Sequence, residues 1–117
     1  YKALVDAAFS SLKNYTESKQ GQIYIMINPA YPGWCKVGMA VDAEDRVNQF
    51  QTGSPFRDYQ LFKFFETDNR RESEKQAHYI LQEKIDDRRG EWFHTTPEEA
   101  EKILTGYFEE KDYESET

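Results

Sequence analysis

Cysteine is almost missing from this sequence: Cys35 is the only one among 117 residues. A single thiol excludes an internal disulfide and a cysteine-based zinc cluster, and it fits a reducing compartment, so we expect a cytoplasmic protein. Its neighbours Trp34 and Lys36 place Cys35 in a predicted strand. There we expect it to pack as a small apolar residue and not to act as a nucleophile.

Long hydrophobic runs are missing as well. No stretch approaches the roughly 20 apolar residues that a membrane-spanning helix needs, so we expect no membrane partner. Signatures that are recognisable from spacing alone, such as H-E-x-x-H, the Walker phosphate loop and G-x-S-x-G, do not occur. Any active site must therefore be assembled by the fold from residues that are far apart in the chain.

Basic side chains are too few to balance the acidic ones, and the net charge of −7 argues against a strong nucleic-acid binder. The acidity is concentrated near the C-terminus, because residues 98–117 hold eight acidic side chains against two lysines. Residues 20–97 carry a net charge of −2 and residues 1–19 carry +1. Phosphate contacts supply most of the affinity for nucleic acids, so residues 20–97 would bind DNA only weakly by themselves.

Four segments are predicted to be strands. Residues 22–28 and 34–39 are rich in β-branched and aromatic side chains, and the prolines and glycine of residues 29–33 turn them into an antiparallel hairpin. Residues 59–66 form a strongly aromatic third strand, and residues 91–94 a short extended segment.

Apolar spacing of three and four residues predicts the helices. Asp42 is a plausible N-cap for one of them, and Thr96, followed by P-E-E, is a strong start for the last. Gly90 is expected to break the longest. The predicted helices are residues 2–18, 42–53, 69–88 and 97–110, with residues 112–117 frayed.

This order of elements predicts a small α+β fold, a mainly antiparallel β-sheet flanked by helices. We divide the chain into an N-terminal amphipathic helix or linker at 1–20, a core at 21–96, and a C-terminal helix with an acidic tail at 97–117.

Five short motifs follow one another along the core. They are G-Q-I-Y-I-M (21–26), C-K-V-G (35–38), D-R-V-N-Q-F-Q-T-G-S-P (45–55), E-K-Q-A-H (74–78) and G-E-W-F (90–93). In this order they resemble the GIY-YIG nuclease superfamily, and in particular its phage and bacterial branch, where K-[IV]-G, E-x-x-x-H and E-W-F recur together. The resemblance covers about residues 21–94 and implies a GIY-YIG-like core with added N- and C-terminal helices.

The resemblance also implies roles for single residues. Tyr24 would lie close to the attacking water and accept its proton, Arg46 would contact the scissile phosphate, and Glu74 would bind one divalent ion, Mg²⁺ or Mn²⁺. Lys36 takes the place of the second motif's tyrosine. The expected catalytic set is Tyr24, Lys36, Arg46, Glu74 and His78, with Glu74 as the metal ligand and Gly38 and Glu91 in supporting positions.

Two departures from the family's pattern accompany the match. The second motif has lysine where the family has tyrosine, and Glu91 or Trp92 falls near the asparagine that commonly ends the family's core.

Elementary chemistry agrees with these roles. Cleavage of a phosphodiester develops negative charge on oxygen, which a divalent cation and a guanidinium stabilise. Mg²⁺ prefers few carboxylates and several waters, so one glutamate suffices, and Arg46 can form two parallel bonds to phosphate. A tyrosine with a pKa near 10 is a poor base unless a cation lowers that pKa. Lys36 can either do this for Tyr24 or contact the phosphate itself.

Each of these residues also has a plainer interpretation. Tyr24 can be an ordinary strand aromatic, Lys36 can face solvent, and Arg46 and Glu74 can form a structural ion pair. His78 is as well explained by a hydrogen-bonded position at the core edge as by a proton shuttle.

The sequence therefore predicts a metal-dependent DNA endonuclease of a phage or bacterial homing, restriction or defence type. The alternative is a non-catalytic module that binds nucleic acid or protein on the same scaffold. A third hypothesis is an oligomerisation domain that forms a homodimer through residues 2–18. The chain begins with Tyr1, not Met, so we expect a piece of a longer protein that carries an additional DNA-binding module.

Overall fold

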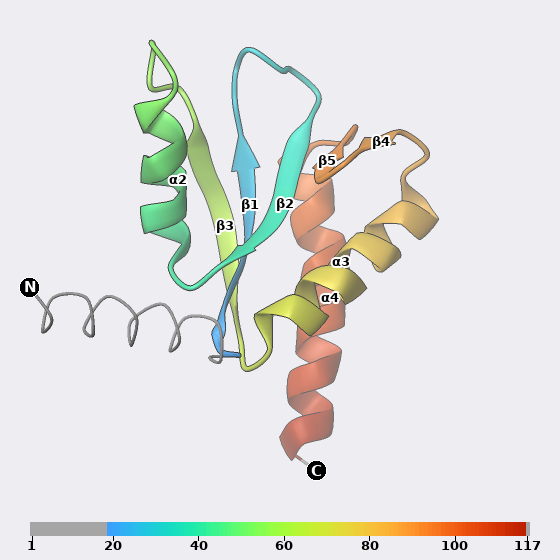
Figure 1. Cartoon of the computed structure of the whole chain (residues 1–117). Coiled ribbons are helices and arrows are strands. Elements are labelled where there is room, and N and C mark those ends of the chain that lie inside the picture. Colours follow the sequence, from blue (N-terminus) through green and yellow to red (C-terminus); the bar gives the residue numbers. More distant parts are fainter. Residues whose placement is uncertain (1–18, 117) are drawn as a thin grey trace, which may run out of the picture.

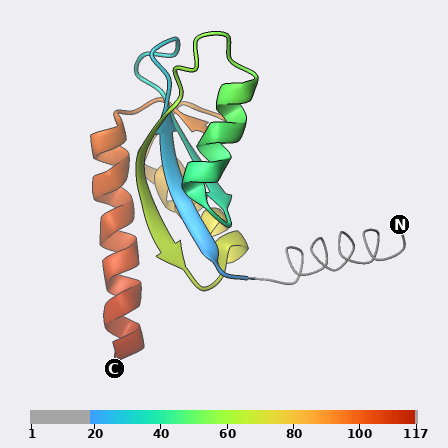
Figure 2. The same cartoon turned by 90° about the vertical axis from the view of Figure 1, so that its left-hand side faces the viewer.

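The computed structural model describes the backbone of residues 19–116 and the side chains of residues 19–109. The helix predicted at residues 2–18 lies outside the described residues. In the described part, a central sheet is covered by helices on both faces (Figures 1 and 2). The predicted α+β class with an antiparallel sheet is confirmed.

The sheet contains five strands in the order β3-β1-β2-β5-β4, and every neighbouring pair is antiparallel. The three long strands lie within one residue of their predicted positions. The bounds are β1 Gly21–Ile27, β2 Cys35–Ala40, β3 Gln60–Thr67, β4 Arg88–Arg89 and β5 Trp92–Phe93.

Strand β1 lies between β2 and β3 and is buried on both faces. Consecutive side chains of a strand point to opposite faces. Ile23 and Ile25 accordingly join one apolar cluster, and Tyr24 and Met26 join another. The uninterrupted run I-Y-I-M-I is what a strand covered by two layers requires.

Three helices form those layers: α2 (Ala43–Thr52), α3 (Arg70–Lys84) and α4 (Pro97–Glu116). Helix α2 covers one face, and α3 and α4 cover the other (Figure 2). Both predicted N-caps are confirmed. The Asp42 carboxylate accepts from the Asp45 backbone N–H at 3.0 Å, and the Thr96 hydroxyl accepts from the Glu99 N–H at 3.2 Å.

The helix predicted at 69–88 is shorter in the structure. Helix α3 ends at Lys84, Ile85 is extended, and β4 pairs with β5 around Gly90. Gly90 has φ +61°, a left-handed conformation that suits a tight hairpin and that glycine adopts without a Cβ clash. Gly90 therefore turns a hairpin instead of ending a helix, and the pairing partner comes from the E-W-F motif.

The last helix is longer than predicted. It runs to Glu116, past the expected end near Glu110 and through the segment that was expected to fray. Its buried face consists of Ala100, Leu104 and Phe108, which pack into the larger apolar cluster. None of the helices in residues 19–116 has the length and apolarity needed to cross a membrane.

Candidate functional site

Tyr24 and Gly38 face each other across the β1–β2 pair. The Tyr24 ring is 1% exposed and lies over the position where residue 38 would carry a side chain. A Cβ on Gly38 would fall 2.6 Å from the Tyr24 hydroxyl oxygen and 2.7 Å from the ring carbon that bears it. Glycine at position 38 therefore makes the room in which the Tyr24 side chain lies.

Beyond Lys36, the backbone groups on the outer edge of β2 form hydrogen bonds with groups that do not belong to a paired strand. Strand β5 pairs with Cys35 and Lys36, after which the Val37 N–H donates to the Glu91 carbonyl at 3.0 Å. Two side chains of α3 reach the same edge. His78 Nε2 lies 2.6 Å from the Val37 carbonyl oxygen, and the Glu74 carboxylate accepts from the Met39 N–H.

This edge explains how two helical residues enter the site. Glu74 and His78 are four positions apart, so they lie on the same side of α3. Backbone groups of β2 that carry no strand partner need other hydrogen-bond partners, and these two side chains provide them. The E-x-x-x-H spacing thereby sets Glu74 beside the β1–β2 pair.

Arg46 approaches from α2, on the face that holds Tyr24. Its guanidinium hydrogen-bonds to the Tyr24 hydroxyl and donates to Gln49 Oε1 at 3.1 Å. The guanidinium carbon also lies 5.2 Å from the centre of the Phe50 ring. Three contacts thus orient an exposed arginine over the buried tyrosine.

A cleft of about 310 Å³ joins these residues. Tyr24, Arg46, Glu74 and Glu91 all line it, although they come from β1, α2, α3 and the β4–β5 turn. The remaining lining residues are Met39, Ala40, Val41, Asp42, Asp45 and Gln49.

The other expected residues border the cleft without lining it. Gly38 lies against the Tyr24 ring. Lys36 Nζ is 3.5 Å from Glu91 Oε2 and 4.2 Å from the centre of the Phe50 ring. Arg88 lies 3.4 Å from His78 Nδ1, so both ring nitrogens of His78 have partners. This geometry favours the hydrogen-bonded position over the proton shuttle, the two roles that the sequence left open.

The family match covers every residue of this cleft. Residues 21–107 match the T5orf172 domain. The chain belongs to the T5orf172 domain family. This is a GIY-YIG-like, endonuclease-associated family. No curated protein and no solved structure matches the chain significantly. The T5orf172 match begins at Gly21, the first residue of the first motif, and continues past the E-W-F motif into α4.

Burial dominates the electrostatics of Tyr24 in this T5orf172 domain. It raises the pKa of the hydroxyl, the Arg46 hydrogen bond and charge lower it, and the Glu91 and Glu74 carboxylates raise it again, to about 12. The cation that acts on Tyr24 is thus Arg46, and Lys36 acts instead on Glu74, whose pKa it lowers. At neutral pH the hydroxyl is protonated and is available as a hydrogen-bond donor.

The carboxyl group of Glu74 also has a raised pKa. Burial is the largest cause, followed by the negative charge of Glu91, while His78, the Met39 N–H and Lys36 oppose the shift. Two carboxylates that repel each other at the wall of a cleft would both be stabilised by a cation placed between them. Within residues 19–116 there is no group of three or more His, Cys, Asp or Glu side chains suited to a metal. A small ligand set completed by water is the mode that Mg²⁺ prefers.

The sequence assigned no role in the site to three residues on or next to α2 that neighbour Arg46. Asp42, Gln49 and Phe50 are four positions before, three after and four after it. Residues at these spacings are neighbours on a helix surface, so helical spacing counted from Arg46 is the signal that would have found them.

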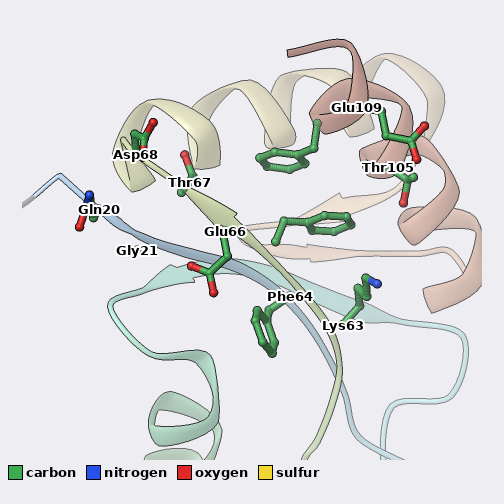
Figure 3. Close-up of a pocket in the computed structure, with 11 residues that line it drawn as sticks. Gln20, Gly21, Lys63, Phe64, Glu66, Thr67, Asp68, Thr105 and Glu109 are labelled. Atoms are coloured by element: carbon green, nitrogen blue, oxygen red, sulfur yellow. The ribbon is translucent and has the colours of Figure 1, made fainter. Parts of the chain in front are cut away.

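A larger cavity, of about 690 Å³, opens between β3 and α4 (Figure 3). None of the expected site residues lines it. Its charged lining residues are three carboxylates, Glu66, Asp68 and Glu109, against Lys63. The smaller cleft is the better candidate for a nucleic-acid site, because Tyr24, Arg46, Glu74 and Glu91 all line it.

Proposed function

We propose that this protein is a metal-dependent DNA endonuclease that uses Mg²⁺ or Mn²⁺, of a phage or bacterial homing, restriction or defence type. The observation that carries the proposal is that Tyr24, Arg46 and Glu74, which are distant in sequence, line one cleft of about 310 Å³. A guanidinium and a carboxylate on the walls of one cleft are the groups that phosphodiester hydrolysis needs. Membership of an endonuclease-associated family supports the same chemistry.

Arg46 is the group for the phosphate. Its guanidinium is exposed in the cleft, and it can form parallel hydrogen bonds to two phosphate oxygens. The contacts with Tyr24, Gln49 and Phe50 hold its direction before substrate arrives. Such preorganised charge is worth more in the transition state than charge that must first be oriented.

Glu74 is the group that would hold the metal, assisted by Glu91. The raised pKa of Glu74, caused partly by the charge of Glu91, fits a site at which a bound cation would offset the repulsion between the two carboxylates. The divalent ion would supply positive charge to the phosphate oxygens and favour deprotonation of water.

Tyr24 orients the attacking water through its hydroxyl. With a pKa of about 12 it can accept a proton only when more positive charge enters the cleft. The pKa of about 12 already includes the effect of Arg46, so the additional charge would come from the divalent ion.

DNA is the proposed substrate, and a further DNA-binding module is proposed to contribute to its binding. The near-neutral charge of residues 20–97 supports this addition, because phosphate contacts supply most of the affinity. A homodimer is also proposed, on the basis of the amphipathic spacing of residues 2–18.

The test is cleavage of supercoiled plasmid by purified protein with Mg²⁺, with Mn²⁺ and with EDTA. We expect nicked or linear product with either metal and none with EDTA. Glu74→Ala and Arg46→Ala should each lower the cleavage rate by about 10²- to 10³-fold, the loss typical of removing one transition-state contact. Matched controls are Glu83→Ala and Arg71→Ala, two exposed residues of α3 that do not line the cleft. Equal cutting by all variants would mean a contaminating nuclease and would refute the proposal.

The second candidate is a binding module without catalysis. Two observations favour it: Lys36 stands where the second motif of the GIY-YIG superfamily has tyrosine, and the Tyr24 pKa of about 12 keeps the hydroxyl protonated at neutral pH, so it is not available as a base. Calorimetric titration with Mn²⁺ separates the two candidates. A nuclease should release or absorb heat that disappears in Glu74→Ala, whereas a binding module should show no heat that depends on Glu74.

A further inference from the structure

A third cavity, of about 460 Å³, is lined almost entirely by aromatic rings. Its lining residues are Tyr31, Trp34, Tyr59, Arg89 and Trp92, which we call the aromatic pocket. Its volume is in the range of small-molecule sites. The proposed hydrolysis uses none of these side chains.

The rings come from three separate parts of the chain. Tyr31 and Trp34 belong to the β1–β2 turn, Tyr59 immediately precedes β3, and Arg89 and Trp92 are paired across the β4–β5 hairpin. Tyr31 meets Trp92 edge to face, with 5.4 Å between ring centres. The fold thus gathers four aromatic side chains at one end of the sheet.

The cation of the pocket is already held against an aromatic face. The Arg89 guanidinium lies 5.8 Å from the centre of the Trp34 ring, and the His94 ring is stacked on Trp34 with 4.8 Å between ring centres. Stacking on rings and on a guanidinium plane is how proteins hold an unpaired nucleobase, and the positive charge also attracts the phosphate attached to it.

The aromatic pocket is connected to the cleft by direct contacts. Lys36 Nζ lies 4.2 Å, and the guanidinium carbon of Arg46 5.2 Å, from the centre of the Phe50 ring. The same ring centre lies 5.5 Å from the centre of the Tyr59 ring. Trp92 directly follows Glu91, which lines the cleft, and consecutive Cα atoms are about 3.8 Å apart. A DNA strand with one phosphate at Arg46 therefore has a base within reach of the aromatic pocket.

We propose that the aromatic pocket binds one unstacked nucleobase of the DNA strand that the neighbouring cleft cuts. The inference rests on the proposed action on DNA and specifies its substrate as DNA with an unpaired or extruded base next to the scissile phosphate. Removing a base from the stack costs less where pairing is already disrupted. The enzyme is accordingly expected to prefer single-stranded, mismatched or distorted sites.

Intrinsic fluorescence provides a direct test, because both tryptophans of the chain, Trp34 and Trp92, line the pocket. The protein is titrated at low salt in EDTA with a twelve-nucleotide oligothymidylate and, separately, with an abasic strand of the same length. EDTA stops cleavage, so binding is measured alone. We expect the oligothymidylate to quench tryptophan emission saturably and the abasic strand to leave it nearly unchanged.

Tyr31→Ala should weaken oligothymidylate binding by about 5- to 150-fold, the range for losing one stacked base, and Tyr31→Phe should restore it. Tyr79→Ala is the matched control, since Tyr79 is 62% exposed on α3 and does not line the pocket, whereas Tyr31 is 49% exposed within it. Arg89→Gln is a second variant with an exposed side chain and should weaken binding as well.

Any one of three results would overturn the proposal that the pocket binds a nucleobase. They are equal quenching by the two strands, no binding of oligothymidylate, and equal affinity of Tyr31→Ala and Tyr79→Ala. These results are independent of the plasmid assay. A protein that cuts plasmid but shows no base-dependent quenching remains a nuclease without this pocket. A protein that binds the base but cuts nothing keeps the pocket and loses the proposed activity.

Discussion

On the face of the sheet covered by α3 and α4, eleven buried residues form one apolar cluster, whereas the face covered by α2 holds five. The larger cluster includes the large and fully buried side chains of Leu81, Phe93 and Leu104. The smaller one contains Tyr24 and small residues such as Ala40 and Ala43, beside which the cleft opens. The larger apolar cluster and most of the proposed site therefore lie on opposite faces of the same strands, and Glu74 reaches the cleft from α3 at the edge of β2.

The division implies that substitutions on the two faces should separate stability from activity. The largest expected effect is on the α3–α4 face. Leu104→Ala removes a fully buried side chain and should lower the free energy of unfolding by about 2–5 kcal/mol, measured by urea denaturation. Below its melting temperature, this variant should keep the specific activity of the unsubstituted protein. Lys102→Ala, an exposed change on the same helix, is the control. A Leu104→Ala protein that is folded but inactive would contradict the separation of stability and activity between the two faces.

Two glycine substitutions compare the faces directly. Gly38→Ala forces a Cβ against the Tyr24 ring and should destabilise the fold by about 1–3 kcal/mol, the usual cost of overpacking. It should also weaken cleavage, because the ring that contacts Arg46 must move.

The counterpart is Gly106→Ala in α4, where an added Cβ meets nothing within 4 Å. Replacing glycine inside a helix should stabilise the protein by about 0.5–1 kcal/mol without altering cleavage. Chemical denaturation and plasmid cleavage measure both variants. The comparison fails if Gly38→Ala is as stable and as active as Gly106→Ala.

Alkaline pH should act through the α2 face. The pKa of Tyr24 is raised from 10.0 to about 12 in the folded protein, so the folded state holds its proton more tightly than the unfolded state. The resulting stability is fully present below pH 10 and is lost as the pH rises through 12, by at most about 3 kcal/mol.

Tyr24→Phe removes this titration, so the stability of the parent chain relative to Tyr24→Phe should fall between pH 10 and 12. When the pH is raised, the absorbance of tyrosinate near 295 nm should show that the variant has one tyrosine fewer with a raised pKa. An equal pH dependence of the two proteins would indicate that the Tyr24 hydroxyl titrates normally.

The smallest effect concerns the ion pair at the border of the cleft. Lys36 and Glu91 lie 3.5 Å apart, with side chains that are 13% and 42% exposed. A double-mutant cycle with Lys36→Met and Glu91→Gln should give a coupling energy of about 0.2–1 kcal/mol, as for other partly exposed pairs. Added Mg²⁺ should reduce this coupling if Glu91 helps Glu74 to hold the cation. A coupling energy that does not change with Mg²⁺ would mean that Glu91 forms the ion pair but does not help to hold the cation.

Much of the fold could be predicted because its signals are local. The aromatic and β-branched runs located β1, β2 and β3, and the side chains of Asp42 and Thr96 marked the starts of α2 and α4. Strand β4 could not be predicted, because two arginines carry no periodicity and become a strand only by pairing with β5. The end of α3 was misjudged for the same reason, since residues 85–88 are extended to reach that pairing.

For the candidate site, the sequence by itself determined which side chains are available and in which order they occur: tyrosine and glycine on paired strands, arginine on a helix, glutamate and histidine one helical turn apart. It also determined that Lys36 replaces a tyrosine. Only the tertiary structure decided that Glu74 reaches the open edge of β2, that Arg46 and not Lys36 contacts Tyr24, and that four aromatic residues meet at one end of the sheet. The physical reason is that burial, pKa and cleft geometry depend on strand order and layer packing, which bring together residues whose separation along the chain carries no record of their contact.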